Sequence, residues 1–291
     1  MIQHFLILIA NCAILVLIGR SFSIIFKVIK FFHFTHAISF TIGCYFTYFL
    51  SITLKFPLFV SIPISLAFGI SSMLSINHFI YKPLEKRNLE NWQMLIVSLG
   101  LYVVLQNVIS MIWGDSTLSF RTWPVKEGYR FVGAYITGIQ IITICVCIAL
   151  IGFSWFFLER TSIGQKVKAV SSNPELSSTV GISKDQAVFW SFVIGTGLVS
   201  SVGLLISADT DMTPTMGFNW LLYGVVAIII GGLGNLRYLV LGALLLASAQ
   251  HLSTYYLDNK WMNAAAYIIL IVFLYFKPYG FSGQPIQKVK I

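Results

Sequence analysis

The stretch AVFWSFVIGTGLVSSVGLLISA covers residues 187–208 and determines the class of fold. It contains no charged residue, and it lies between Asp185 and Asp209. A helix that crosses the hydrocarbon core of a bilayer needs about 20 consecutive, mainly apolar residues. The stretch is therefore predicted to be a transmembrane helix.

Further apolar runs of similar length lie on both sides of this stretch. They are too long for the strands of a membrane barrel, which need only about 10 residues, so helices are expected. Residues 21–36 are also apolar but include two lysines and two histidines, which leaves open whether they cross the membrane. The predicted fold is an all-α polytopic transmembrane bundle of about eight to ten spans, forming a single domain over residues 1–291. The other clear runs are residues 5–18, 38–54, 58–81, 94–113, 134–157, 220–234, 238–252 and 262–276.

The composition agrees with a membrane protein. Of the 291 residues, 57% are hydrophobic and 10% are charged, whereas soluble domains contain about 25% charged residues. The net charge of +9 could suggest nucleic acid as a partner. However, the basic residues lie in short loops beside apolar runs, as the positive-inside rule describes. The charge is therefore interpreted as membrane orientation, with no nucleic-acid partner.

The loop charges also predict which side of the membrane each loop faces. The basic segments 81–91 and 159–185 and the tail with Lys277, Lys288 and Lys290 are predicted to be cytoplasmic. The acidic loop 209–218 is predicted to be external. Counting spans backward then places residues 114–133 on the external side as well, despite their basic residues.

No residue pattern points to catalysis. The loops contain no carboxylate cluster, no set of His and Cys ligands and no nucleophile beside a base, so no catalytic residue, metal or cofactor is predicted. The four cysteines lie inside apolar runs and are expected to be packing residues. The N-terminal run lacks a basic region and a cleavage site, so it is expected to be a retained helix.

The loop 159–185 is the largest hydrophilic segment. Ser172 or Asn173 is suited to cap a short helix with Pro174 at its first position, and Gly181 is suited to end it. Such a helix could be a simple connector between two spans. It could also be a coupling helix that a partner protein pushes.

A family resemblance favours the coupling role. Residues 161–169 (TSIGQKVKA), followed by Asn173 and the pair Gly181-Ile182, resemble the cytoplasmic loop of ABC-transporter permeases of the branched-chain amino acid (LivH/LivM) family. Gln165 departs from the family's Arg, His33 from its Asn and Ala37 from its Gly. Further similar motifs, in the family's order and favouring the LivH-like half, are HFTHA (33–37), YKPL (81–84), LQN (105–107), GGLGN (231–235) and KPYG (277–280).

The resemblance implies a permease subunit of an ATP-driven importer in a bacterial inner membrane. Such a chain forms the path for branched-chain or related amino acids and is not an enzyme. The implied partners are a second permease subunit (LivM-like, or a second copy in a homodimer), two cytoplasmic ATPase subunits and an external substrate-binding protein. The loop 159–185 would meet an ATPase. The residues implied in coupling are Gly164, Lys166, Lys168, Asn173, Glu175 and Gly181.

Three polar residues at membrane depth are candidates for the substrate path, because such residues are costly in lipid. His36 could line the path or lie at the interface beside Lys27 and Lys30. Gln106 and Asn107 are adjacent in one span and point about 100° apart. One of them can therefore line the path while the other forms a hydrogen bond between helices.

The glycines Gly231, Gly232 and Gly234 are not part of a nucleotide-binding pattern, because no strand precedes them and no Lys follows. They are predicted to allow close helix packing or a helix break.

Other functions are less well supported by the residues. The same family resemblance also fits an importer of urea or short amides. An ion-coupled secondary transporter would normally have acidic residues inside a span, and the clear spans contain none. An intramembrane enzyme would need a partner for His33 and His36.

Overall fold

The computed structural model describes residues 2–123, 128–131, 134–232 and 235–282. They form two compact units: unit 1 comprises Met1–Ser23, Val125–Ala149 and Leu222–Ile291, and unit 2 comprises Ile24–Pro124 and Leu150–Leu221. Three helices contain residues of both units, namely α1 (Ile2–Ile29), α6 (Gly138–Arg160) and α10 (Met216–Gly231).

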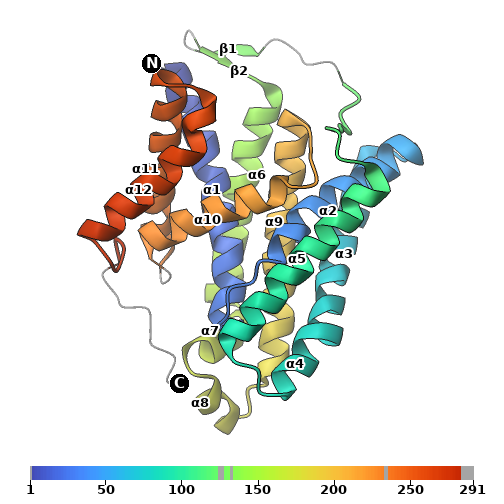
Figure 1. Cartoon of the computed structure of the whole chain (residues 1–291), viewed down its shortest axis with the longest axis vertical. Helices are drawn as coiled ribbons and strands as arrows, with labels where there is room; N and C mark the ends of the chain where they lie inside the picture. Colours follow the sequence, from blue (N-terminus) through green and yellow to red (C-terminus); the bar gives the residue numbers. More distant parts are fainter. Residues whose placement is uncertain (1, 124–127, 132–133, 233–234, 283–291) are drawn as a thin grey trace. The chain divides into compact units, whose positions relative to one another are not determined.

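The other elements each belong to one unit (Figure 1). Unit 1 also contains β1 (Tyr129–Phe131), β2 (Ala134–Ile136), α11 (Leu236–Tyr256), the 3₁₀-helix η3 (Asn259–Trp261) and α12 (Met262–Phe276). Unit 2 contains α2 (His36–Tyr48), the π-helix η1 (Phe49–Thr53), α3 (Leu58–Ile76), the π-helix η2 (Asn77–Tyr81), α4 (Lys82–Lys86), α5 (Asn91–Trp113), α7 (Ser162–Ser172), α8 (Pro174–Thr179) and α9 (Lys184–Thr210).

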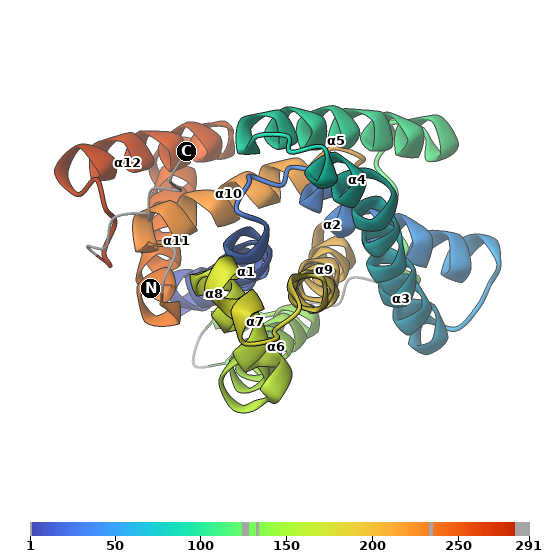
Figure 2. The same ribbon diagram turned by 90° about the horizontal axis from the view of Figure 1, so that it is seen from below.

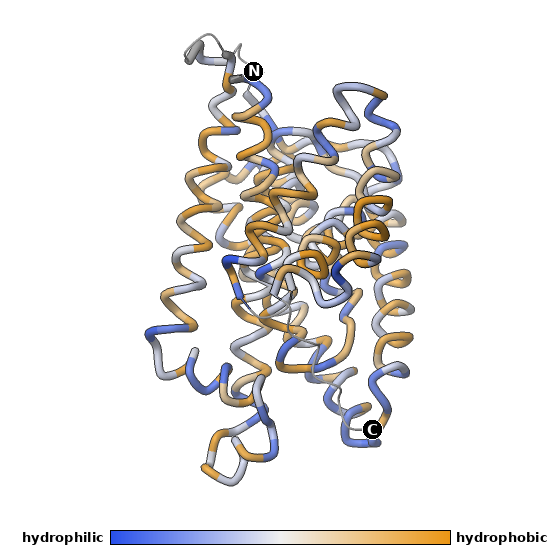
Figure 3. The backbone as a smooth tube through the Cα atoms, turned by 90° about the vertical axis from the view of Figure 1, so that its left-hand side faces the viewer, coloured by the Kyte–Doolittle hydropathy of each residue, from blue (hydrophilic) through white to orange (hydrophobic). Residues whose placement is uncertain are grey.

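The predicted all-α membrane class is confirmed. Seven helices among the described residues are long and apolar enough to cross a bilayer, and α10 is a shorter apolar helix. Together they agree with the lower end of the predicted eight to ten spans. Hydrophobic residues follow most of the length of the long helices, and hydrophilic residues gather at their ends and turns (Figure 3).

The structure corrects two predicted boundaries. The ambiguous residues 21–36 are divided, because the first nine continue α1 and the chain then leaves the helix at Lys30, which has a φ of 63°. The predicted span 134–157 begins later, because Ala134–Ile136 pairs with Tyr129–Phe131 in an antiparallel hairpin. Hairpin pairing satisfies part of the backbone groups of these residues, and the outward N–H of Tyr135 donates to the side chain of Gln3.

The core of unit 2 is built where α2, α3 and α9 pack against one another (Figure 2). Gly203 of α9 allows this close approach, because a Cβ there would lie 2.4 Å from the carbonyl oxygen of Phe40. One turn away, the Ser200 hydroxyl donates a hydrogen bond of 2.6 Å to the carbonyl oxygen of Ser39. Small residues bring transmembrane backbones together, and hydroxyl groups bond across the contact. These two features fix α9 against α2.

Candidate functional site

The predicted short helix in the loop 159–185 is present, and a second helix precedes it. The side chain of Asn173 accepts a hydrogen bond of 3.1 Å from the Leu176 N–H, and Pro174 opens α8 as predicted. The preceding helix α7 begins at a cap that was not predicted from the sequence. The Thr161 hydroxyl accepts a 3.0 Å hydrogen bond from the Gly164 N–H. A threonine just before a helical segment is the signal that could have indicated α7.

Gly164 holds α7 against the end of α6. A Cβ at this position would lie 2.2 Å from the carbonyl oxygen of Phe157 and 2.5 Å from the Cα of Leu158. Any other residue would have to push the two helices apart. The sharp turn between α6 and α7 therefore depends on this glycine.

Polar contacts attach the two short helices to the rest of unit 2. Lys30 donates a hydrogen bond of 2.5 Å from Nζ to the carbonyl oxygen of Ser171, and burial lowers the pKa of its amine. Lys168 forms an ion pair with Glu159. Helix α7 also packs against α9. The pair α7–α8 is therefore anchored at its start, along its length and near the end of α7.

The free surface of α7 and α8 carries charged and apolar groups. Lys166 and Glu175 are exposed, and Gly181 ends the segment with a φ of 78°. Leu176 and Val180 are 65% and 73% exposed. Apolar side chains this exposed outside a membrane span suggest a protein contact. Their exposure was not predicted, although the spacing of four residues beside polar residues is visible in the sequence.

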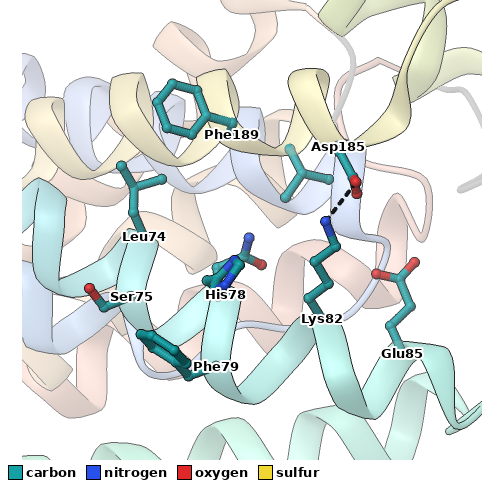
Figure 4. Close-up of a pocket in the computed structure, with 10 residues that line it drawn as sticks. Leu74, Ser75, His78, Phe79, Lys82, Glu85, Asp185 and Phe189 are labelled. Atoms are coloured by element: carbon teal, nitrogen blue, oxygen red, sulfur yellow. Dashed lines mark hydrogen bonds and ion pairs between the residues drawn. The ribbon is translucent and has the colours of Figure 1, made fainter.

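Basic and acidic residues of two segments meet at the same end of unit 2. The Nζ of Lys82 lies 2.7 Å from Oδ2 of Asp185, and Lys184 forms an ion pair with Glu85. These contacts join the segment 81–91 to the end of the loop 159–185, two segments that were predicted to share the cytoplasmic side. A groove of about 450 Å³, lined by residues of α3, η2, α4 and the start of α9, includes Lys82, Glu85 and Asp185 (Figure 4).

The loops predicted to be external also meet each other. Leu118 and Met212 form a β-bridge. Arg121 donates to the carbonyl oxygen of Asp209 at 3.1 Å and contacts Oδ1 of Asp211 at 3.3 Å. The basic loop 114–133 thus contacts the acidic loop 209–218. Their position on the external side of the membrane stays a prediction.

The three candidate path residues occupy different environments. His36 is fully buried at the start of α2, and its ring lies 6.2 Å from that of His33. Gln106 is half-buried and donates to the Ser110 hydroxyl at 3.3 Å. Asn107 is exposed, and one of its amide hydrogens is directed to the carbonyl oxygen of Val103 at 2.7 Å. Of the three candidates, Asn107 is the exposed residue in this conformation, whereas Gln106 is half-buried and His36 is buried.

The glycine motif lies in unit 1 at the end of α10. Gly231 packs closely on α11, since a Cβ there would lie 2.4 Å from the carbonyl oxygen of Tyr238. Gly232 has a φ of 95°, and the helix ends at this point. Gly234 lies outside the described residues, as do Lys288 and Lys290. Among the described residues, no group of three or more His, Cys, Asp or Glu side chains is arranged to hold a metal ion.

A family model and two known proteins that resemble this chain agree on one family. The family model described as the permease component of branched-chain amino acid transport systems matches residues 5–276. The high-affinity branched-chain amino acid transport permease LivH of Escherichia coli is 25% identical over 288 residues, covering 94% of this chain and 92% of LivH. The corresponding permease BraD of Pseudomonas aeruginosa is 26% identical over 295 residues, covering 94% of this chain and 93% of BraD.

A solved structure supports the fold. The structure of PsaBC from Streptococcus pneumoniae in complex with Fab contains a chain with a TM-score of 0.54 and 12% sequence identity. The match covers 92% of this chain and 89% of that chain. At this level of identity the similarity concerns the arrangement of the helices.

Proposed function

Because this chain belongs to the permease family of branched-chain amino acid transport systems, we propose that it imports branched-chain or related amino acids across a bacterial inner membrane. It is a multi-pass permease subunit of an ABC importer, and ATP hydrolysis takes place on partner subunits. An external binding protein delivers the substrate. The chain supplies part of the path and the surface through which the ATPase subunits act.

The geometry of the loop 159–185 carries this proposal. A lever must be stiff, must be attached to the helices that move and must present a free surface to the protein that pushes it. The pair α7–α8 meets these requirements. Gly164 seats it on the end of α6, Ser183 caps the start of α9 directly after it, and Leu176 and Val180 remain exposed.

In the proposed mechanism, closure of the two ATPase subunits on ATP displaces α7 and α8. Because α7 begins immediately after α6 and α8 leads within a few residues into α9, a displacement of the pair moves both spans. The spans then shift between outward and inward openings. Gly164 is proposed to act in coupling by seating the buried start of α7 on α6. The exposed residues proposed to meet the ATPase are Lys166, Lys168, Asn173, Glu175 and Gly181, together with Leu176 and Val180.

The path is proposed to lie along the exposed face of α5, where a second permease chain completes it. Asn107 is exposed in the last third of this span, and lipid is a poor environment for an amide. Water and polar substrate in a path between two permease chains would satisfy the free amide groups. Gln106 borders the same face. His36 is sealed inside unit 2, so it would reach substrate only after α2 moves.

Replacement of Leu176 by Asp tests the contact with the ATPase. Burial of a leucine side chain contributes about 1.5–3 kcal/mol, so its loss should weaken ATPase binding by about tenfold or more. Uptake of labelled isoleucine should fall in parallel. The measurements are copurification of the ATPase subunits with the permease and energised uptake in cells. Glu175→Lys, which inverts an exposed charge, should act in the same direction.

The matched control is Ser178→Asp, which places the same charge on another exposed position of α8. Neither Leu176→Asp nor Ser178→Asp touches the buried core, so the expression and membrane insertion of both variants should stay at wild-type levels. Unchanged ATPase copurification and uptake in both Leu176→Asp and Glu175→Lys would refute the coupling role. If an intact importer that couples ATP hydrolysis to transport does not take up isoleucine, the proposed substrate class is refuted.

A further inference from the structure

The groove between α9 and the segment formed by α3, η2 and α4 has apolar walls at one end and charged walls at the other (Figure 4). Leu74, Phe79 and Phe189 line the apolar end, and Lys82 and Asp185 line the charged end. Phe79 is 74% exposed and Phe189 is 45% exposed. The groove is therefore open along the outer surface of the helices.

The depth of the groove in the membrane follows from helix length. The continuous helical segment Leu58–Lys86 has 29 residues, so it is about 44 Å long at 1.5 Å per residue. The hydrocarbon core is only about 30 Å thick, or about 20 residues. Counted from Leu58, the core ends near Asn77, where the sequence changes from apolar to polar.

The opposite wall changes character at the same level. Helix α9 begins with Lys184 and Asp185 and becomes apolar from Ala187 onward. Since Lys82 and Asp185 contact each other at 2.7 Å, the charged ends of both walls lie together. The groove thus crosses the boundary between the headgroup layer and the acyl chains. An occupant must be apolar at one end and charged at the other, which describes a membrane lipid.

The charges of the groove select among lipid headgroups. Among the residues that line the groove, Lys82 is basic, whereas Glu85 and Asp185 are acidic. An anionic headgroup would therefore meet more carboxylates than ammonium groups. A zwitterionic headgroup matches the arrangement, because its phosphate can accept hydrogen bonds from Lys82 and His78 while its cationic end meets a carboxylate. The side chain of Asp185 is 69% exposed, which leaves it free to accept further hydrogen bonds.

We propose that this groove binds the headgroup of a phosphatidylethanolamine molecule of the surrounding bilayer. The ammonium group donates to Asp185 and Glu85, the phosphate accepts from Lys82, and an acyl chain lies along Phe79 and Phe189. Phosphatidylcholine has the same charges but no N–H donor on its cationic nitrogen, so it cannot make the hydrogen bonds to the carboxylates. The inference depends on the membrane location of the chain and not on the substrate that it transports.

The test is a competition between lipids with identical acyl chains. The purified importer in detergent micelles is mixed with equimolar dioleoyl phosphatidylethanolamine, phosphatidylcholine and phosphatidylglycerol, and retained lipid is counted by native mass spectrometry. Ethanolamine lipid should be retained about three- to tenfold more than choline lipid, as expected for one or two exposed charge-assisted hydrogen bonds. This comparison uses the wild-type protein and needs no variant.

Two substitutions locate the preference in the groove. Asp185→Asn should reduce the difference between ethanolamine and choline lipids, because Glu85 is then the one carboxylate of the pair left to accept from the ammonium group, and Lys82→Met should reduce the retention of both. Asp258→Asn, an exposed aspartate of unit 1, is the matched control and should keep the preference. Equal retention of the ethanolamine and choline lipids, a preference for phosphatidylglycerol, or a preference unchanged by Asp185→Asn would each overturn the proposal.

Discussion

Helices α9 and α5 are both long apolar spans of unit 2, yet the structure places them in opposite environments. In the most apolar 18-residue stretch of α9, 67% of the residues are buried, compared with 17% for α5. Helix α9 packs on α2 and α3, whereas α5 exposes a face that includes Ile96, Val104 and Met111. Apolarity therefore places a helix in the membrane without deciding whether protein or lipid surrounds it.

The two helices differ in the residues that occupy their contact faces. The buried residues of α9 include glycines and hydroxyl residues at intervals of three to five positions, among them Gly195, Ser200, Gly203 and Ser207. Lipid tails are as apolar as leucine, so association of helices depends on close packing and hydrogen bonds. Glycine allows close packing and serine supplies hydrogen bonds, so residues of these two kinds distinguish the central helix α9. On α5 the exposed Gly100 and Asn107 are exceptions, and they lie on the face proposed to meet a second permease chain.

The largest expected effect comes from breaking the central contact with Gly203→Val. The new side chain would clash with the backbone of α2 at Phe40, and overpacking of this kind costs about 1–3 kcal/mol or more. The thermal midpoint of the purified chain, followed by fluorescence-detected size exclusion, should fall strongly. Gly152→Val is the control, because nothing lies within 4 Å of a Cβ at that glycine. Similar midpoints for the two variants would disprove the role given to Gly203.

An intermediate effect, on assembly alone, is expected for Gly100→Leu. A Cβ at Gly100 meets nothing within 4 Å, so the chain should fold with an unchanged thermal midpoint. If a second permease chain packs on α5, the bulky side chain should lower the yield of permease pairs and reduce uptake. Gly152→Leu tests an exposed glycine outside this face and should assemble normally. If Gly100→Leu forms permease pairs with the wild-type yield, the second chain must pack on a surface other than this face of α5.

The smallest expected effect on stability comes from removing one hydrogen bond between α9 and α2. Ser200→Ala removes the bond to the Ser39 carbonyl and should cost about 0.6 kcal/mol, with about 1.7 as an upper limit. In Ser248→Ala the lost bond is to Leu244 of the same exposed helix face, so its cost should be smaller. Equilibrium unfolding in mixed micelles can compare the two. A larger loss for Ser248→Ala would contradict the interhelical role of Ser200.

Parts of the candidate site could be predicted because they depend on neighbouring residues. The cap at Asn173, the proline that starts α8 and the positive φ of Gly181 are local features, and the sequence pattern contains them. Helix α7 was not predicted, although the Thr161 cap is a local signal for its start. Its packing on the backbone of α6 through Gly164 is a contact that only the tertiary structure shows. The exposure of Leu176 also depends on tertiary structure, because packing decides which apolar residues other parts of the protein cover.

The sequence by itself determined that this protein is a bundle of membrane helices with a hydrophilic loop at residues 159–185. The reason is that hydrocarbon forces each backbone group into a local hydrogen bond, and long apolar runs can satisfy this only as helices. Tertiary structure alone decided which helix lies at the centre of unit 2, that His36 is sealed while Asn107 is exposed, and that Lys82 meets Asp185 beside a groove. These contacts join residues far apart in the chain. They depend on how the surfaces of two segments fit together, and the sequence of either segment alone does not determine that fit.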